Sequence, residues 1–256
     1  MEIFTSDGFP IFVRSLHVLA GIAWIGLLYY FNLIQVPAFA AYGDEGKARN
    51  ISIDKLARRA LWWFRWAAVV TLVLGLLLIG VTKDYMKDFM GDESVNLSAN
   101  AAIFVGMVLG ITMAANVWMV IWKNQKIVLA NAANVLAGGE ADPGAASAGR
   151  RAVLASRQNM IFSFSMLWFM VGAAHFYNSL GFADKENELA AGGAWMFVII
   201  SVVIGGVLQL NALGKLGGTA NTNKLLWPYE SHKNAMITGG VLFVVLYVLS
   251  EILLKA

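Results

Sequence analysis

Six stretches of the chain are long and apolar enough to cross a lipid bilayer. They lie at about 11–34, 62–81, 101–122, 159–178, 194–214 and 235–254. A helix rises about 1.5 Å per residue, so each stretch is close to the ~20 residues that cross ~30 Å of hydrocarbon. Because lipid offers no hydrogen-bond partner to an open backbone, we expect all six stretches to be helical. The pattern predicts an all-α fold, a polytopic integral membrane bundle of six transmembrane helices.

The composition agrees with this class. Apolar residues make up 59% of the chain and charged residues only 14%, against roughly 25% charged residues in a soluble domain. The first stretch does not resemble a secretory signal peptide, because its leader carries Glu2 and Asp7 in place of a basic run. The absence of cysteine excludes disulfides, iron–sulfur clusters and thiolate metal sites. We expect residues 1–256 to form a single membrane domain.

The basic residues predict an orientation. The segments after the first, third and fifth spans hold most of them: Lys47, Arg49, Lys55, Arg58, Arg59, Arg65, Lys123, Lys126, Arg150, Arg151, Arg157, Lys215, Lys224 and Lys233. By the positive-inside rule these segments are cytoplasmic and both termini are outside. The net charge of +3 is therefore a topology signal, and we expect the lipid bilayer and no nucleic acid as a partner.

Two segments between the spans have features of their own. Residues 123–136 keep a helical period and are predicted to extend the third span into the cytoplasm. The sequence GGEADPGAASAG at 138–149 predicts a flexible cytoplasmic linker.

Two of the three histidines lie inside predicted spans, His17 in the first and His175 in the fourth. An ionisable residue within a membrane is costly to leave unpaired, so it is by default a functional hypothesis. The first span enters from outside and the fourth returns there, which places both imidazoles about 5–10 Å deep in the outer half of the bilayer. Matched imidazoles predict haem b, with both histidines as axial ligands of the iron.

Small and aromatic residues share the helical face of each histidine. They are Gly21 and Trp24 in the first span and Trp168 and Gly172 in the fourth. The glycines would leave space for a porphyrin plane, and the tryptophans would pack below it and close the pocket. Arg14 is expected to pair with a haem propionate. The alternative is ordinary membrane packing, in which glycine lies at helix contacts, tryptophan at the interface, and the arginine extends toward water.

Other candidate ligands have weaker support. Glu251, near the outer end of the last span, leaves a histidine–carboxylate metal site as an alternative to haem. His232 precedes the last span and has either a solvated, loop-bonding role or a contact with substrate. The methionines show no clustered ligand spacing, which argues against a copper site.

Polar side chains gather at the cytoplasmic ends of the spans. They are Asn32, Gln35, Arg65, Asn116, Asn124, Gln125, Lys126, Asn159, Ser163, Gln209 and Asn211. Such groups either recognise a small polar heterocycle by paired hydrogen bonds or join helices to one another. We select Asn116 and Gln125 as the first residues to test for a catalytic or substrate-binding role. No nucleophile–base pair or phosphate-binding glycine loop is visible, which disfavours hydrolase and kinase chemistry.

Three segments carry a resemblance to a known family. They are LHVLAGIAWIGLLYYFNLIQVPAF at 16–39, NVWMVIWKNQKIVLAN at 116–131 and RQNMIFSFSMLWFMVGAAHF at 157–176. These resemble the membrane domain of the cytochrome-c-linked urate oxidases, or urate hydroxylases. The pattern of the first span, a histidine followed by Trp-x-Gly and an aromatic pair, is also similar to membrane protoporphyrinogen oxidases and copper-resistance D-type proteins.

The resemblance implies a bacterial inner-membrane oxidoreductase of purine metabolism. The family oxidises urate to 5-hydroxyisourate without releasing peroxide and passes electrons to a cytochrome c domain fused at the C-terminus. This sequence reaches Ala256 with no Cys-x-x-Cys-His haem attachment motif, so we expect a separate cytochrome c or other membrane subunits as partners. The open alternatives are a non-catalytic haem-binding or structural subunit of a larger respiratory or oxidase complex, and a porphyrinogen oxidase. A transporter is disfavoured because no internal repeat is apparent.

Overall fold

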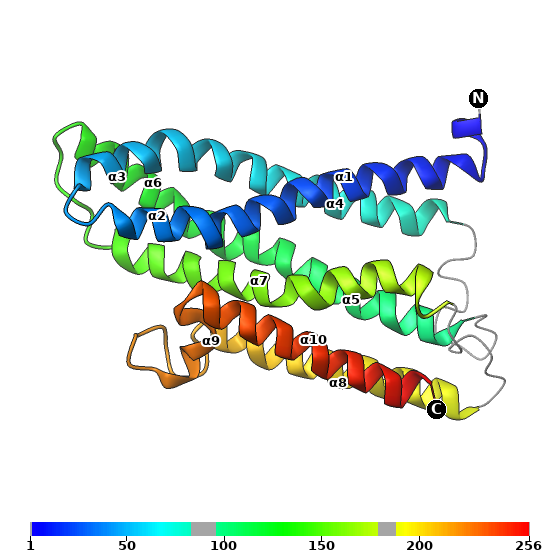
Figure 1. Cartoon of the computed structure of the whole chain (residues 1–256). Helices are drawn as coiled ribbons and strands as arrows, with labels where there is room; N and C mark the ends of the chain where they lie inside the picture. The colour runs from blue at the N-terminus through cyan, green and yellow to red at the C-terminus, as the bar shows by residue number, and fades with distance from the viewer. Residues whose placement is uncertain (1, 83–95, 179–187, 256) are drawn as a thin grey trace.

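The computed structural model describes residues 2–82, 96–178 and 188–255, and within these ranges every regular element is a helix (Figure 1). The α-helices are α1 (Gly8–Tyr29), α2 (Val36–Ala41), α3 (Gly46–Ser52), α4 (Arg58–Val81), α5 (Leu97–Ala115), α6 (Trp122–Leu136), α7 (Ala145–His175), α8 (Glu188–Ala212), α9 (Trp227–Glu230) and α10 (His232–Leu254). Three π-helical segments are η2 (Tyr30–Gln35), η3 (Ile53–Ala57) and η4 (Asn116–Ile121), and two 3-10 segments are η1 (Glu2–Phe4) and η5 (Lys224–Leu226). The predicted all-α class is confirmed.

Several of these segments join into longer helices. Among the described residues, five helices are long and apolar enough to cross a membrane: Gly8–Ala41, Gly46–Val81, Leu97–Leu136, Gly192–Ala212 and His232–Leu254. They contain four of the six predicted spans in full, and a fifth, 194–214, except for its last two residues. The predicted extension of the third span by residues 123–136 is confirmed, because α6 continues η4 without a break.

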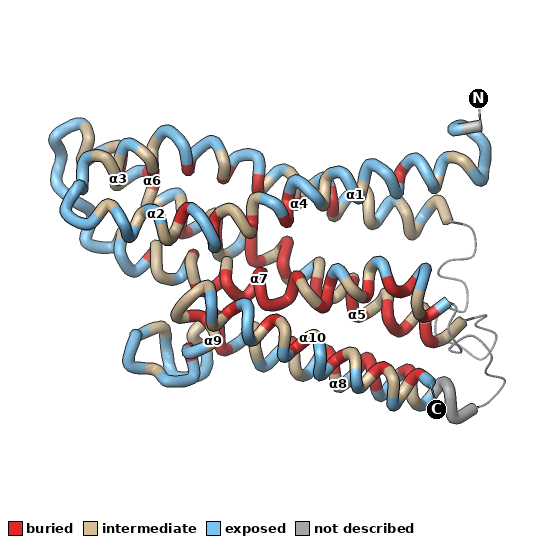
Figure 2. The backbone as a smooth tube through the Cα atoms, in the orientation of Figure 1, coloured by how far each residue is buried: buried red, intermediate tan, exposed pale blue. Residues whose placement is uncertain are grey.

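The remaining predicted span, 159–178, falls largely in α7. This helix is not among the five apolar ones, because polar and basic residues interrupt its sequence. It packs against α5, α6, α8 and α10, and Figure 2 shows many of its residues buried. Arg157, Gln158, Asn159, Ser163 and Ser165 are all buried. Protein therefore encloses these side chains, so the helix does not need an apolar sequence at these positions.

The long helices run side by side between two ends of the bundle (Figure 1). The termini end is the one where the chain begins and the last helix finishes. The basic end is the opposite one, where α3, α9, the last turn of α6 and the first turn of α7 lie. The segments whose basic residues predict a cytoplasmic location are gathered at this basic end.

Helix contacts depend on glycine at particular positions. A Cβ added to Gly239 of α10 would lie 2.7 Å from the Phe164 ring and 3.3 Å from the Ile161 Cα of α7. A Cβ on Gly106 of α5 would lie 3.2 Å from the Met170 backbone nitrogen. Small residues at these contacts let the backbones approach, which is the usual basis of helix packing in membranes.

The segment between α6 and α7 is shorter than the predicted linker 138–149. Helix α7 already begins at Ala145, where the alanine-rich run AASA favours helix. The preceding turn is held by the Asn134 Nδ2 donating to the Glu140 carbonyl at 2.7 Å and by the Asp142 N–H donating to Asn131 Oδ1 at 2.7 Å.

Candidate functional site

The imidazole of His17 is held by helix α4. Its Nδ1 lies 2.8 Å from the Thr71 carbonyl oxygen. A backbone carbonyl only accepts, so Nδ1 is the donor, and in the neutral ring the lone pair is then on Nε2. A histidine that ligates a metal commonly has its other ring nitrogen fixed by such a bond. The local geometry of His17 therefore fits the role of an iron ligand.

Glycine residues make room for this arrangement. A Cβ added to Gly75 would lie 3.1 Å from His17 Cε1, so the imidazole rests directly on the glycine backbone of α4. Gly21, one turn further along α1, faces the Thr71 side chain, with its added Cβ 3.9 Å from Cγ2. Sequence reasoning did not identify Thr71 or Gly75, because spacing along α1 gives the face of His17 but not the neighbour that covers it.

His175 is the last residue of α7 and is exposed at the termini end. The buried Gly172 accepts hydrogen bonds at its carbonyl from the backbone N–H groups of Phe176, at 2.7 Å, and Tyr177, at 2.9 Å. Trp168 donates from Nε1 to the Tyr177 hydroxyl at 3.2 Å. Its ring also packs against two aromatic rings of α10, Phe243 and Tyr247.

The structure thus places the predicted haem residues in two groups at one end of the bundle. His17 and Gly21 face α4, whereas Trp168 faces α10. The direct bonds between the first helix and α7 lie nearer the middle and the basic end, where Tyr29 bonds Ser163 at 2.9 Å and Asn32 bonds Ser156 at 2.9 Å. Toward the termini end α1 and α7 stand apart in Figure 1.

Two further predicted residues belong to α1. Arg14, one turn before His17, is exposed, as a residue that reaches toward water or a propionate would be. Trp24 is 3% exposed, and its Nε1 has no hydrogen-bond partner in the described part of the chain. A buried indole N–H without an acceptor costs free energy, so Trp24 is a donor open to a group that the protein alone does not provide.

Asn116 lies in a closed set of amides, which we term the amide clamp. Its Nδ2 donates to Asn159 Oδ1 at 2.8 Å and to Gln209 Oε1 at 3.0 Å, and its Oδ1 accepts from Gln209 Nε2 at 2.7 Å. Asn159 in turn donates to the Met113 carbonyl at 2.9 Å. These bonds join η4, α7 and α8, so the clamp acts as a connection between helices.

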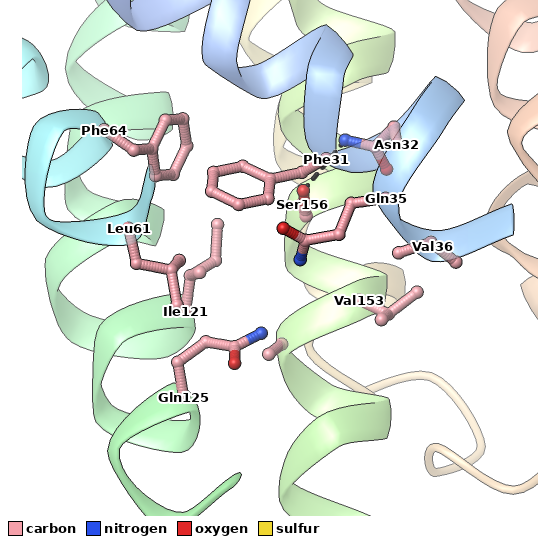
Figure 3. A pocket seen from close by; sticks show the side chains of 11 residues that line it. Phe31, Asn32, Gln35, Val36, Leu61, Phe64, Ile121, Gln125, Val153 and Ser156 are labelled. Carbon is pink, nitrogen blue, oxygen red and sulfur yellow. Dashed lines mark hydrogen bonds between the residues drawn. The ribbon is translucent and has the colours of Figure 1, made fainter. Parts of the chain in front are cut away.

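Gln125 lines a small cavity near the basic end of the bundle (Figure 3). The cavity volume is about 30 Å³, enough for about two water molecules. Its lining residues are Phe31, Asn32, Gln35, Val36, Leu61, Phe64, Ile121, Gln125, Ala152, Val153 and Ser156. They come from four long helices, and among them are two of the polar residues that the sequence places beside Gln125 at the cytoplasmic side, Asn32 and Gln35.

The cavity amides differ in how they are held. Asn32 is fixed, because its Nδ2 donates to the Leu28 carbonyl at 2.9 Å and to Ser156 Oγ at 2.9 Å. Gln35 is only 9% exposed, yet its Oε1 has no hydrogen-bond partner among the described residues. In Figure 3 the amides of Gln35 and Gln125 point into the space between them.

Two π-helical segments border this cavity. Phe31, Asn32 and Gln35 belong to η2, and Ile121 is the last residue of η4. Single π turns inside α-helices are rare and frequent at functional sites, because they re-aim side chains. Sequence reasoning did not predict them.

The other candidate ligands are not clustered. No group of three His, Asp or Glu side chains in the described ranges is placed to hold a metal ion. Glu251 lies 3.4 Å from the Lys255 ammonium. His232 is the first residue of α10, half-buried at the basic end.

Fold and site together define an all-helical protein with membrane-spanning helices and polar groups inside the bundle. Residues 92–210, somewhat less than half of the chain, match the family described as "Urate oxidase N-terminal". The match confirms the resemblance to the urate oxidases and points to a urate-related oxidoreductase of a membrane type. It includes His175, the amide clamp and Gln125, and it begins after His17. No curated protein and no solved structure matches the chain.

Proposed function

We propose that this protein is a membrane-bound haem b oxidoreductase that oxidises urate and passes the electrons to an external cytochrome c. The observation that carries the haem assignment is the bond from His17 Nδ1 to the Thr71 carbonyl, which leaves the Nε2 lone pair for iron. The match of residues 92–210 to the urate oxidase N-terminal family supports the substrate class.

In this proposal the bundle lies in the inner membrane of a bacterium with its basic end in the cytoplasm. The positive-inside rule supports that orientation, with both termini outside. Helix α7 completes the set of six spans and is the fourth along the chain. The five apolar helices and the loops at the basic end require a further crossing between α6 and α8, and the burial of the polar residues of α7 makes that crossing compatible with lipid.

His17 and His175 would hold the haem iron, and Arg14 would pair with a propionate at the outer surface. Bound haem would supply a one-electron carrier at the termini end, on the side where an external cytochrome c accepts electrons. Thr71 and Gly75 orient the His17 ring through its bond and its packing.

The overall reaction balances with water as the source of oxygen. Urate and one water molecule give 5-hydroxyisourate, two protons and two electrons. The electrons leave in two one-electron steps to the cytochrome, and peroxide is not formed because molecular oxygen is not the acceptor. The two protons remain on the side of the membrane from which the substrate binds.

The haem assignment is tested by a dithionite-reduced minus oxidised optical spectrum of the purified protein. We expect the absorption bands of a b-type haem, and loss of most of them in His17→Ala and His175→Ala. His232→Ala, which removes the remaining histidine at the opposite end, is the matched control and should keep them. Absence of haem from the wild-type protein would overturn the proposal. Haem retained in both ligand variants would overturn the ligand assignment.

A further inference from the structure

We infer that the cavity between η2, α4, α6 and α7 is the binding site for a planar heterocycle whose edge alternates ring N–H and C=O groups. The cavity is bordered by three amide side chains and one hydroxyl, from Asn32, Gln35, Gln125 and Ser156. This inference rests on the proposed function for its choice of urate as the ligand, and the hydrogen-bonding chemistry of the cavity is independent of that function.

The unpaired side-chain carbonyl of Gln35 is the main reason to assign a ligand to this cavity. Gln35 is nine-tenths buried, and its Oε1 is unpaired within the part of the chain that the structure describes. A buried carbonyl without a donor costs about 1–3 kcal/mol. A ligand N–H would remove that cost. The amide clamp, a few turns away, shows that the same residue types in this bundle can be fully paired.

Primary amides are suited to this type of ligand. Each presents one acceptor and two donors in a plane, so an amide can form two parallel hydrogen bonds with a ring lactam. Gln35 and Gln125 approach from different helices, α1 with its η2 continuation and α6, and their amides point into the space between them (Figure 3). The two glutamines can therefore hydrogen-bond to two edges of one heterocycle at the same time.

The walls of the cavity suit a flat ring. Phe31 and Phe64 meet edge to face, with ring centroids 5.3 Å apart and an interplanar angle of 78°. They form an apolar side next to the amides, together with Leu61 and Ile121. Aromatic and aliphatic walls with a few polar groups are the usual make-up of a small-molecule site.

The ligand must displace side chains in order to bind, since the cavity volume of about 30 Å³ holds only about two water molecules. Asn32 is held by two hydrogen bonds and stays in place. The Gln35 carbonyl has no partner to lose on moving, and Gln125 is half-buried. We therefore expect these two glutamines to swing aside and then close on the ring.

The cavity lies far from the proposed haem ligand His17. Gln35 and His17 lie 18 residues apart on one continuous helix, which corresponds to about 27 Å along its axis. Electrons would then pass from the basic end to the termini end through the intervening side chains, of which Trp24 and Tyr29 are aromatic. Substrate would bind from the cytoplasmic side and the electrons would leave outside.

The test is the affinity of the purified, oxidised protein for urate, measured by isothermal titration calorimetry. We expect Gln35→Leu and Gln125→Leu each to weaken binding by about tenfold, the effect of losing one to two hydrogen bonds to a ligand. The matched control is Gln209→Leu, which removes a paired amide of the clamp outside the cavity and should leave the affinity unchanged. A urate analogue methylated at its ring nitrogens should bind at least tenfold more weakly to the wild type.

A second substitution guards against loss of folding. Val153→Phe fills the cavity from α7 without touching an amide, and it should also abolish urate binding while the thermal unfolding midpoint stays near that of the wild type. Unchanged affinity in Gln35→Leu and Gln125→Leu would overturn the inference.

The two proposals fail in distinguishable ways. If urate reduces the haem of the wild type but the cavity variants bind it normally, the site is wrong and the function stands. If the cavity variants lose urate binding in a protein that contains no haem, the site stands and the proposed function is wrong.

Discussion

The bundle contains two sets of polar groups on its long helices that use their hydrogen-bonding capacity differently. In the amide clamp, Asn116, Asn159 and Gln209 bond to one another and to the Met113 carbonyl. In the second set, His17 keeps a lone pair on Nε2 and Gln35 keeps an unpaired carbonyl. Both sets are amides or imidazoles on membrane helices, and their residue types alone do not separate them.

We infer a structural role for the first set and a ligand-binding role for the second. Closed networks join helices, since a polar group in hydrocarbon is satisfied most readily by a neighbouring helix. A buried group left unpaired costs free energy, and a ligand that bonds to it removes that cost. The comparison predicts that substitutions in the clamp reduce stability, and that substitutions of His17 and Gln35 reduce ligand binding.

The largest expected effect is on haem content in Gly75→Val. The new side chain would collide with His17, since even a Cβ at Gly75 lies 3.1 Å from Cε1. The imidazole must move away from Thr71 and lose its orientation. We expect the haem-to-protein ratio of the purified protein, measured optically, to fall more than tenfold, because the groups that orient a metal ligand typically contribute about 10–100-fold in affinity.

The control for this variant lies on the same helix. Gly80 has no atom within 4 Å of its added Cβ, so Gly80→Val should keep the haem content of the wild type. Equal haem loss in both variants would mean that α4 responds to valine in general and that the contact with His17 has no special role.

The second effect concerns the clamp itself. Asn116→Leu removes three hydrogen bonds and leaves the amides of Asn159 and Gln209 partly unpaired. We expect a loss of about 2–4 kcal/mol in the free energy of unfolding in detergent. Gln125→Leu should cost less than about 0.5 kcal/mol, because its amide is not part of a network. If the two variants were equally stable, the distinction between the two sets would be wrong.

The third effect concerns the apolar contact between α10 and α7, which involves no polar group. Gly239→Ala places a Cβ 2.7 Å from the Phe164 ring, at the contact of α10 with α7. Overpacking of this kind costs about 1–3 kcal/mol, which thermal unfolding would detect as a lowered midpoint. The adjacent Gly240 has open space at its Cβ, so Gly240→Ala should leave the midpoint nearly unchanged. If both variants lowered the unfolding midpoint, the effect would come from replacing glycine in this helix and not from the contact with Phe164.

The smallest effect belongs to a paired charge outside the membrane. Arg150 donates to both Glu230 carboxylate oxygens, at 2.9 and 2.6 Å. This hydrogen bonding lowers the pKa of Glu230 below its ordinary value. The pair therefore adds stability above the unfolded-state pKa of about 4.3, and that stability is lost as the pH falls through the lower folded-state pKa.

Because Glu230 is partly exposed, we expect Glu230→Gln to cost less than about 1 kcal/mol at neutral pH. The difference from the wild type should shrink as the pH is lowered toward about 3. Unfolding midpoints measured at both pH values check this. A difference that grows at low pH would contradict the assigned sign.

The positions of the helices could be predicted from the sequence, whereas the contacts between the helices could not. Hydrophobic stretches place five helices and the extension over 123–136, because the period and the length of a membrane helix are local properties. The start of α7 at Ala145 was missed, since glycine and proline nearby outweighed the alanines. The π-helical segments η2 and η4 were not predicted, because the hydrophobic period of the sequence does not distinguish a π turn from the α-helix around it.

The candidate site divides in the same way. In the structure His17 and His175 lie toward the termini end, and Gln125 lines a cavity with Asn32 and Gln35. Their roles as haem or substrate ligands stay predictions. Spacing does not reveal that His17 is covered by Thr71 and Gly75 of α4, or that Trp168 faces α10. Helical periodicity gives the face of a residue, and only the tertiary arrangement supplies the residue on the other side.

Oxidation of urate at the expense of haem is tested by adding urate, without oxygen, to the purified haem-loaded protein and recording its optical spectrum. We expect urate to reduce the haem, with two haem equivalents reduced per urate oxidised, and His17→Ala to give no such change. A haem that dithionite reduces and urate does not would contradict this expectation, and would favour a haem-binding subunit without urate-oxidising activity.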